Sequence, residues 1–271
     1  MSLIVTAVLL GILEGLTEFL PVSSTGHLIL ATKFFGYDDD QWAVFNIVIQ
    51  LGAILAVVVL YWRTIWAVVE GLLRGEQAAI RFVVNLLVAF MPAAVIGVLL
   101  KKHIEAQLAN PLGVAWALVI GGFAILAIER LAKTGDYVGV GQLPVGKALG
   151  IGFMQCLAMF PGVSRSGATI MGAMCMGVNR RTAAEFSFFL AIPTMLGATV
   201  LELGSHWKTL AHASTNVGFG EIAVGFAVAF VVALAVIKGF VAYISRHGFS
   251  PFAIYRILAG GAALWLLTHG A

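Results

Sequence analysis

The stretch Glu14-Gly-Leu-Thr-Glu18-Phe-Leu-Pro21-Val-Ser-Ser-Thr-Gly-His27 interrupts a run of apolar residues between positions 3 and 35. Glu14 and Glu18 are four residues apart, so on a helix their carboxylates lie on one face, one turn apart. Pro21 disfavours continuation of that helix. The hydroxyl residues after it are N-cap types for a second helix, expected from about position 28. The stretch therefore predicts a helix, a polar break and a second helix.

The composition places this break inside a membrane. The 271 residues are 61% hydrophobic and 11% charged, whereas an average soluble domain is about a quarter charged. We therefore expect an all-α polytopic membrane protein, with residues 1–271 forming a single integral membrane domain. Cys156 and Cys175 lie in apolar stretches and are interpreted as buried thiols without a metal or disulfide role. No basic segment precedes the first apolar run, so no cleavable signal peptide is expected.

Six further apolar segments are long enough to span a bilayer, which takes about 20 residues. They are residues 41–61, 80–100, 111–128, 182–203, 218–237 and 251–268. Residues 3–35 and 145–177 are different, because each consists of two short apolar runs around a polar break. Such pairs predict re-entrant hairpins, which enter the membrane and return to the same side.

The two hairpins match when Glu14 is placed on Gln155. The other matched pairs are Gly11 with Gly152, Phe19 with Phe160, Val22 with Val163, Ser23 with Ser164, Thr25 with Ser166, Gly26 with Gly167 and Phe45 with Phe186. This predicts two repeats, residues 1–130 and 143–271, each a re-entrant helical hairpin followed by three transmembrane helices. A hairpin does not change sides and three spans do, so the repeats are expected to have inverted topology.

Basic residues differ between the two sides that this topology defines. The N-terminal side carries Lys33, Lys101, Lys102 and Lys208, and the opposite side carries Arg63, Arg74, Arg81, Arg130, Lys133, Lys147, Arg180, Arg181, Lys238 and Arg246. The positive-inside rule assigns the richer side to the cytoplasm. Both termini and the first hairpin are then expected on the outer side.

Glu14 and Glu18 have two readings. They are solvated at the end of a tilted helix, or they are intramembrane carboxylates, which are costly and usually functional. In the second reading they hold a hard divalent cation, or one of them acts as a base. Ser23, Ser24 and Thr25 are helix caps or members of the same site, and His27 is a buried histidine or a functional group beside them.

The second break, Pro161-Gly-Val-Ser-Arg-Ser-Gly-Ala-Thr169, contains a guanidinium that requires an anion. Arg165 is flanked by Ser164 and Ser166, with Thr169 one turn later. The N-terminus of the helix that follows adds free N–H groups, so the combination predicts a phosphate site. An ion pair with Glu14 or Glu18 is the alternative and is compatible with it. Arg256 in the last span either reaches the cytoplasmic surface or faces the core.

The segments 14–27, 161–169 and 250–256 together resemble the bacitracin-resistance-type undecaprenyl-pyrophosphate phosphatases, over essentially the whole chain. The resemblance implies a membrane enzyme that removes the terminal phosphate of undecaprenyl pyrophosphate, recycling the lipid carrier for peptidoglycan synthesis, with a divalent cation, Mg or Ca. The family's motifs fall on Glu14, Glu18, Ser24, Thr25, His27, Pro161–Ser166, Thr169 and Arg256. Acid-phosphatase-like lipid phosphatases fit poorly, because Met171 stands where their pattern requires histidine.

Two functions follow. As an enzyme, the chain would use Arg165 and two helix N-termini to bind phosphates, Glu14 and Glu18 to hold the cation or activate the nucleophile, and Ser24 or His27 as the nucleophile, with Ser24 preferred. Ser23, Thr25, Ser164, Ser166, Thr169 and Arg256 would contact phosphate. As a lipid-carrier flippase or secondary transporter, it would use the inverted repeats alone. Expected partners are undecaprenyl pyrophosphate, membrane lipids and a second copy in a homodimer, without nucleic acid, in the bacterial inner membrane.

Overall fold

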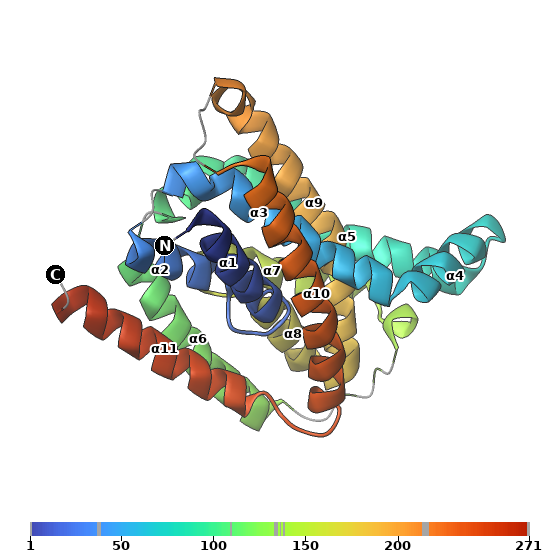
Figure 1. Ribbon diagram of the computed structural model, residues 1–271. Helices are drawn as coiled ribbons and strands as arrows, with labels where there is room; N and C mark the ends of the chain where they lie inside the picture. The colour runs from blue at the N-terminus through green and yellow to red at the C-terminus, as the bar shows by residue number, and fades with distance from the viewer. Residues whose placement is uncertain are drawn as a thin grey trace.

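The computed structural model describes residues 2–36, 39–108, 110–132, 135, 137, 139–212 and 217–269, without the side chains of 39–41, 43, 105, 106, 108, 203 and 205–212. Its regular structure is helical (Figure 1), and the one β contact among these residues is an isolated bridge between Tyr137 and Val178. Lys133 lies outside the described residues. The side chain of Lys208 is also outside them.

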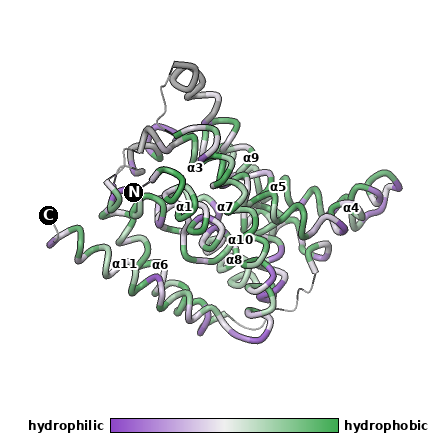
Figure 2. Tube along the Cα trace, viewed as in Figure 1, coloured by the Kyte–Doolittle hydropathy of each residue, from purple (hydrophilic) through white to green (hydrophobic). Residues whose placement is uncertain are grey.

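Five described helices are long and apolar enough to cross a membrane. They are α5 (Gln77–Leu108), α6 (Pro111–Leu131), α9 (Arg180–His212), α10 (Phe219–Ile244) and α11 (Ser250–His269). A sixth candidate is α3 (Asp39–Leu60), whose apolar part forms a bent pair with α4 (Trp62–Leu73) at an angle of 69°. The prediction of an all-α polytopic membrane protein is confirmed. Hydrophobic residues, coloured green in Figure 2, run along most of the length of these helices.

The helix α4 was not predicted. The bend lies at Tyr61, where the apolar run of α3 gives way to Trp62 and Arg63. Trp62, Trp66 and Leu73 are exposed, so α4 packs weakly on the rest and projects to the right in Figure 1. The apolar segment of the sequence predicted that a span ends here, but it did not predict the short helix that follows.

The two predicted broken segments are present. The first is α1 (Leu3–Thr17), a break, and α2 (Ser24–Phe35). The second is α7 (Val145–Cys156) with the short 3₁₀ helix η2 (Leu157–Met159), a break, and α8 (Arg165–Cys175). A second 3₁₀ turn, η1 (Val140–Gln142), precedes α7. The helix after the first break begins four residues earlier than expected, because the Ser23 side chain accepts a hydrogen bond from the Gly26 N–H and caps it there.

The long helices pack in pairs around the broken segments. α1 lies on α10, α7 on α5, α3 on α10 and α9, and α6 on α11; the α6–α11 pair forms one edge of the molecule in Figure 1. Glycines allow the closest contacts, since a Cβ on Gly11 would lie 2.7 Å from the Gly225 carbonyl oxygen and one on Gly152 would lie 2.4 Å from that of Ala89.

The main apolar core surrounds the point where the two breaks meet. Phe19 packs edge-on against Phe188 with ring centroids 5.4 Å apart, and both rings are fully buried. The interpretation of the cysteines as buried is wrong: Cys175 is exposed at the end of α8 and Cys156 is half-buried. Each lies at or near the last turn of a short helix, where fewer neighbours cover it.

Candidate active site

Each break ends in a serine with an unusual backbone conformation. Ser23 has φ 75° and Ser164 has φ 78°, and they are the two non-glycine residues with positive φ in the described chain. Each serine caps the helix that follows, because its Oγ accepts from the N–H of Gly26 or of Gly167. Strained residues of this kind cluster at functional sites. The result is two capped helix N-termini, those of α2 and α8, at the centre of the protein.

A chain of polar contacts joins the two breaks. Ser24 Oγ donates a short hydrogen bond to Glu18 Oε2, and Arg165 Nη2 donates to Glu18 Oε1 at 2.7 Å. Ser24 and Glu18 are buried and Arg165 is mostly buried. One carboxylate therefore accepts from the serine hydroxyl on one side and from the guanidinium on the other.

The rest of the Arg165 guanidinium is held by α9. Its Nη1 donates to the Ser187 carbonyl at 2.9 Å, with Ser187 Oγ at 3.4 Å. Its Cζ lies over the Phe19 ring, 6.0 Å from the ring centroid. Arg165 Nε has no acceptor in the described chain. Sequence analysis did not identify Ser187, because an ordinary serine inside an apolar span carries no local signal.

Glu14 lies one helical turn before Glu18 and takes no part in this chain of contacts. Its side chain is 0% exposed, and neither carboxylate oxygen has a hydrogen-bond donor among the described residues. The reading of Glu14 and Glu18 as solvated at a helix end is therefore wrong. A fully buried carboxyl group without a donor requires a proton or a cation.

A cavity of about 530 Å³ opens above Glu18, Ser24 and Arg165. Its polar wall includes Gln50 and Gln155, and its apolar wall is formed by side chains of α5 and α9. The other polar residues of the break regions that line it are Ser23, Thr25 and Ser164. The cavity extends along α5 to Ile104 and along α9 to Glu202, so it has polar residues at the breaks and a largely apolar wall beyond them.

The sequence comparisons decide the family. Residues 7–262 match the family model described as "Bacitracin resistance protein BacA". The chain belongs to the BacA family. Similar proteins named undecaprenyl-diphosphatase include those of Novosphingobium aromaticivorans (67% identical, covering 98% of this chain and 99% of the relative), Rhizorhabdus wittichii (57%, 99% and 99%) and Sphingopyxis alaskensis (56%, 96% and 97%).

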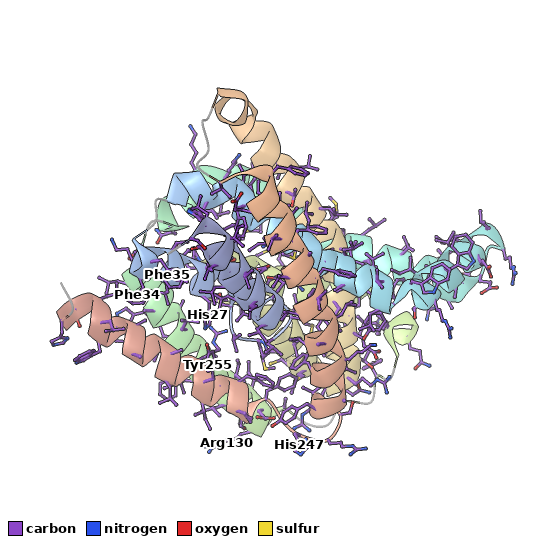
Figure 3. All side chains as sticks on the ribbon, viewed as in Figure 1. His27, Phe34, Phe35, Arg130, His247 and Tyr255 are labelled. Carbon is purple, nitrogen blue, oxygen red and sulfur yellow. The ribbon has the colours of Figure 1, made fainter. Side chains whose placement is uncertain are left out.

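In this BacA-family protein, His27 does not face Ser24. Its Nδ1 lies 2.7 Å from the Ser23 carbonyl oxygen and its Nε2 lies 2.8 Å from the Tyr255 hydroxyl. A carbonyl can only accept, so Nδ1 carries hydrogen, and in the neutral ring Nε2 accepts from Tyr255. Figure 3 shows the two side chains together between α2 and α11. His27 is not among the residues that line the cavity.

Ser166 and Thr169 also lie outside the cavity wall. Ser166 Oγ donates to the Leu20 carbonyl at 2.7 Å, which ties the second break to the first. Thr169 Oγ1 contacts Ser187 Oγ at 2.6 Å. The phosphate-binding role predicted for these two hydroxyls stays a prediction, and in the structure they support the loops that hold the site.

Arg256 faces the core and is 1% exposed, so the reading that it extends to the surface is wrong. It too is absent from the cavity wall. Of the predicted site residues, the BacA-family structure thus brings Glu18, Ser23, Ser24, Thr25, Ser164 and Arg165 to one cavity, with Glu14 buried below it. Four predicted site residues lie outside the cavity wall: His27, Ser166, Thr169 and Arg256.

Proposed function

We propose that this protein is a membrane phosphatase that hydrolyses undecaprenyl pyrophosphate to undecaprenyl phosphate and inorganic phosphate. The product is the lipid carrier used in peptidoglycan synthesis. Relatives named undecaprenyl-diphosphatase cover nearly the whole chain. The structural observation that carries the proposal is the contact chain from Ser24 through Glu18 to Arg165 at a cavity with an apolar extension.

In this proposal Ser24 is the nucleophile and Glu18 its base. Ser24 Oγ bonds to the terminal phosphorus while its proton moves to Glu18, the acceptor that it already contacts. The bond from that phosphorus to the bridging oxygen breaks, and undecaprenyl phosphate leaves with the electron pair and takes the proton from Glu18. Water then gives a proton to Glu18 and bonds to the phosphorus of the phosphoserine. The bond from phosphorus to the Ser24 oxygen breaks, that oxygen takes the proton from Glu18, and inorganic phosphate is released.

Arg165 stabilises charge on the transferred phosphoryl group. Its Nε–H has no acceptor in the described chain, while its other nitrogens are engaged by Glu18, Ser187 and Met195. A phosphate oxygen would satisfy that donor. The N-termini of α2 and α8 add positive dipole ends on the two sides.

Glu14 fits a role as a ligand of a divalent cation, because both of its oxygens lack a donor. Among the described residues, no group of three or more His, Cys, Asp or Glu side chains could share a metal ion. Mg²⁺ commonly takes one or two carboxylates and completes its shell with substrate phosphates and water. Glu14 would then be a ligand of the ion, Mg or Ca, which would neutralise charge on the pyrophosphate. Glu18 would be the second ligand in the alternative in which it does not act as the base.

We also propose that the fold consists of two inverted repeats, residues 1–130 and 143–271, each with a re-entrant hairpin. Two observations support it. Ser23 and Ser164 have similar φ and equivalent caps. The packing is also reciprocal, since α1 lies on the second long helix of repeat two (α10) and α7 lies on that of repeat one (α5).

We propose the inner membrane as the location, with the cavity open to the outer side. The cavity reaches Lys101 and Glu202, near the ends of α5 and α9 on the side poorer in basic residues. Membrane lipids are the expected surroundings, and a homodimer stays the expected assembly.

The decisive experiment is phosphate release from undecaprenyl pyrophosphate by the purified protein, with and without a chelator. Release that the chelator stops and that Mg²⁺ or Ca²⁺ restores supports both the phosphatase and the cation. Release that is insensitive to the chelator contradicts the cation. No release under any condition contradicts the phosphatase and leaves the flippase or transporter as the function to test.

A further inference from the structure

Arg256 of α11 is a buried cation whose partners are main-chain carbonyls. Its Nη1 donates to Pro21 O and Val163 O, both at 3.0 Å. Its Nη2 donates to Gly162 O at 2.9 Å and to Ala117 O at 3.0 Å.

The fifth donor of Arg256, Nε, lies 3.3 Å from Leu118 O. A guanidinium has five N–H donors in a fixed planar arrangement. These contacts use all five, and no carboxylate of the described chain forms an ion pair with it.

The carbonyls that Arg256 binds come from both breaks. Pro21 lies midway between Glu18 and Ser24, and Val163 lies two residues before Arg165. One planar group therefore joins the segment that carries the nucleophile and base to the segment that carries the phosphate-binding arginine. The carbonyls of Ala117 and Leu118 add α6 as a rigid support, because α6 packs along α11.

The adjacent helix is shaped for this guanidinium. A Cβ on Gly121 of α6 would lie 2.1 Å from Arg256 Nη2 and 2.7 Å from Cζ. Only glycine leaves room there, so the place of the guanidinium is fixed by its surroundings as well as by its hydrogen bonds.

We propose that Arg256 is a positioning residue that locks the two helix breaks together and so sets the distance between Ser24, Glu18 and Arg165. It acts through the backbone and does not bind phosphate. This inference rests on the proposed phosphatase function for its kinetic consequence. Its structural consequence, a fixed separation of the two breaks, is independent of that function.

The first test uses Arg256→Lys and Gly121→Ala in the purified full-length protein. Lysine keeps the charge but has three donors, and alanine at position 121 displaces the guanidinium without touching the cavity. We expect both to lower kcat for undecaprenyl pyrophosphate about 100-fold, the effect of misplacing a reacting group by about 1 Å. KM and inhibition by inorganic phosphate should change less than about threefold, since substrate binding is retained.

The control for alanine is Gly261→Ala on α11, where an added Cβ meets no atom within 4 Å; it should match the wild type. A large rise in KM with weaker phosphate inhibition would make Arg256 a phosphate ligand and overturn the proposal. Wild-type kcat in folded Arg256→Lys and Gly121→Ala would overturn it too. Failure of both variants to fold would make Arg256 a folding residue only, which also overturns the proposal.

The second test does not depend on activity. Spin labels at Thr25→Cys and Ala158→Cys, in a background with Cys156 and Cys175 replaced by serine, report the separation of the two break regions by electron paramagnetic resonance. Gly121→Ala should broaden or shift that separation, and Gly261→Ala should not. An unchanged separation overturns the positioning role. A wild type without phosphatase activity overturns the proposed function and leaves this measurement valid.

Discussion

The contact between Ser24 and Glu18 is the single pair with the greatest chemical consequence. Because Glu18 accepts the Ser24 hydrogen bond, Ser24→Ala should abolish phosphate release. Glu18→Gln should lower kcat by about 10²–10⁴-fold, the usual contribution of a general base. Steady-state phosphate release measures both. Ser245→Ala, which changes an exposed hydroxyl bonded to its own helix, is the matched control and should be fully active.

A trapped phospho-enzyme distinguishes the two nucleophiles that the sequence left open. A phosphoserine at Ser24 survives acid, whereas a phosphoramidate at His27 is acid-labile. We expect an acid-stable adduct in the wild type and in His27→Gln, because His27 points to Tyr255 and away from the cavity. An acid-labile adduct that disappears in His27→Gln would reverse the assignment.

Gln155 is a cavity residue for which the sequence predicted no role. It matches Glu14 when the sequences of the two repeats are aligned. It is buried in the cavity wall, and its Nε2 has no acceptor among the described residues. We expect Nε2 to donate to the pyrophosphate. A hydrogen bond to a charged group contributes about 1.5–3 kcal/mol, so Gln155→Met should raise KM about tenfold or more.

Steady-state kinetics measures the effect of Gln155→Met, and Gln142→Met is its control, since Gln142 is exposed and outside the cavity wall. An unchanged KM in a folded Gln155→Met protein would show that the amide serves only its contact with Thr194.

The sequence predicted which residues close to the two breaks lie near one another. Local pattern brings Glu18 and Ser24 to one break, and the need of Arg165 for an anion suggested its pairing with a glutamate. The surroundings of His27 and Arg256 were not predictable, because their partners lie far away in the chain: Tyr255 for the imidazole, and the carbonyls of α6 and both breaks for the guanidinium. Any residue type can supply a main-chain carbonyl, so the sequence does not show which carbonyls accept these hydrogen bonds.

At the scale of elements, the breaks combine a helix cap with a strained backbone. Ser164 has φ 78° and ψ 116° and caps α8. Strain of this kind costs about 1–3 kcal/mol. Ser164→Gly removes the strain and loses only a few tenths of a kcal/mol of capping, whereas Ser164→Ala keeps the strain and loses about 1 kcal/mol. The glycine variant should therefore be the more stable by about 1–3 kcal/mol.

Thermal unfolding in detergent measures the difference between the Ser164 variants. The Ser245 pair is the matched control, because Ser245 has a helical φ of −66°, and there alanine should be at least as stable as glycine. Equal melting temperatures for the two Ser164 variants would show that position 164 stores no strain in the protein in solution.

Element boundaries were predictable where hydropathy and capping agree. The predicted spans begin within a few residues of the observed starts of α3, α5, α6, α9, α10 and α11. Three of these helices, α5, α9 and α10, continue beyond their predicted ends at positions 100, 203 and 237, to 108, 212 and 244. The helix α4 was absent from the prediction. Helix ends of this kind are the least predictable part of an element, because a helix can continue by backbone hydrogen bonding after the apolar pattern changes.

For the whole molecule, the path of the cavity gives a direction to the proposed site. Its inner end is formed by the two breaks, and its outer end by Lys101 and Ile104 of α5 and Glu202 of α9. The α4–α5 turn, which carries Arg74, lies at the opposite end of α5. The distribution of basic residues predicts that this end of α5 is cytoplasmic, so substrate is expected to enter from the outer side.

This orientation is tested by single cysteines in a background that lacks Cys156 and Cys175. Lys102→Cys and Arg74→Cys are suitable, because both positions are exposed and they flank α5 at opposite ends. A membrane-impermeant maleimide should label position 102 in intact cells and position 74 only after the membrane is opened. Phosphate release by both variants confirms that they are folded. Labelling of position 74 alone in intact cells would invert the molecule, and the cavity would then receive its substrate from the cytoplasm.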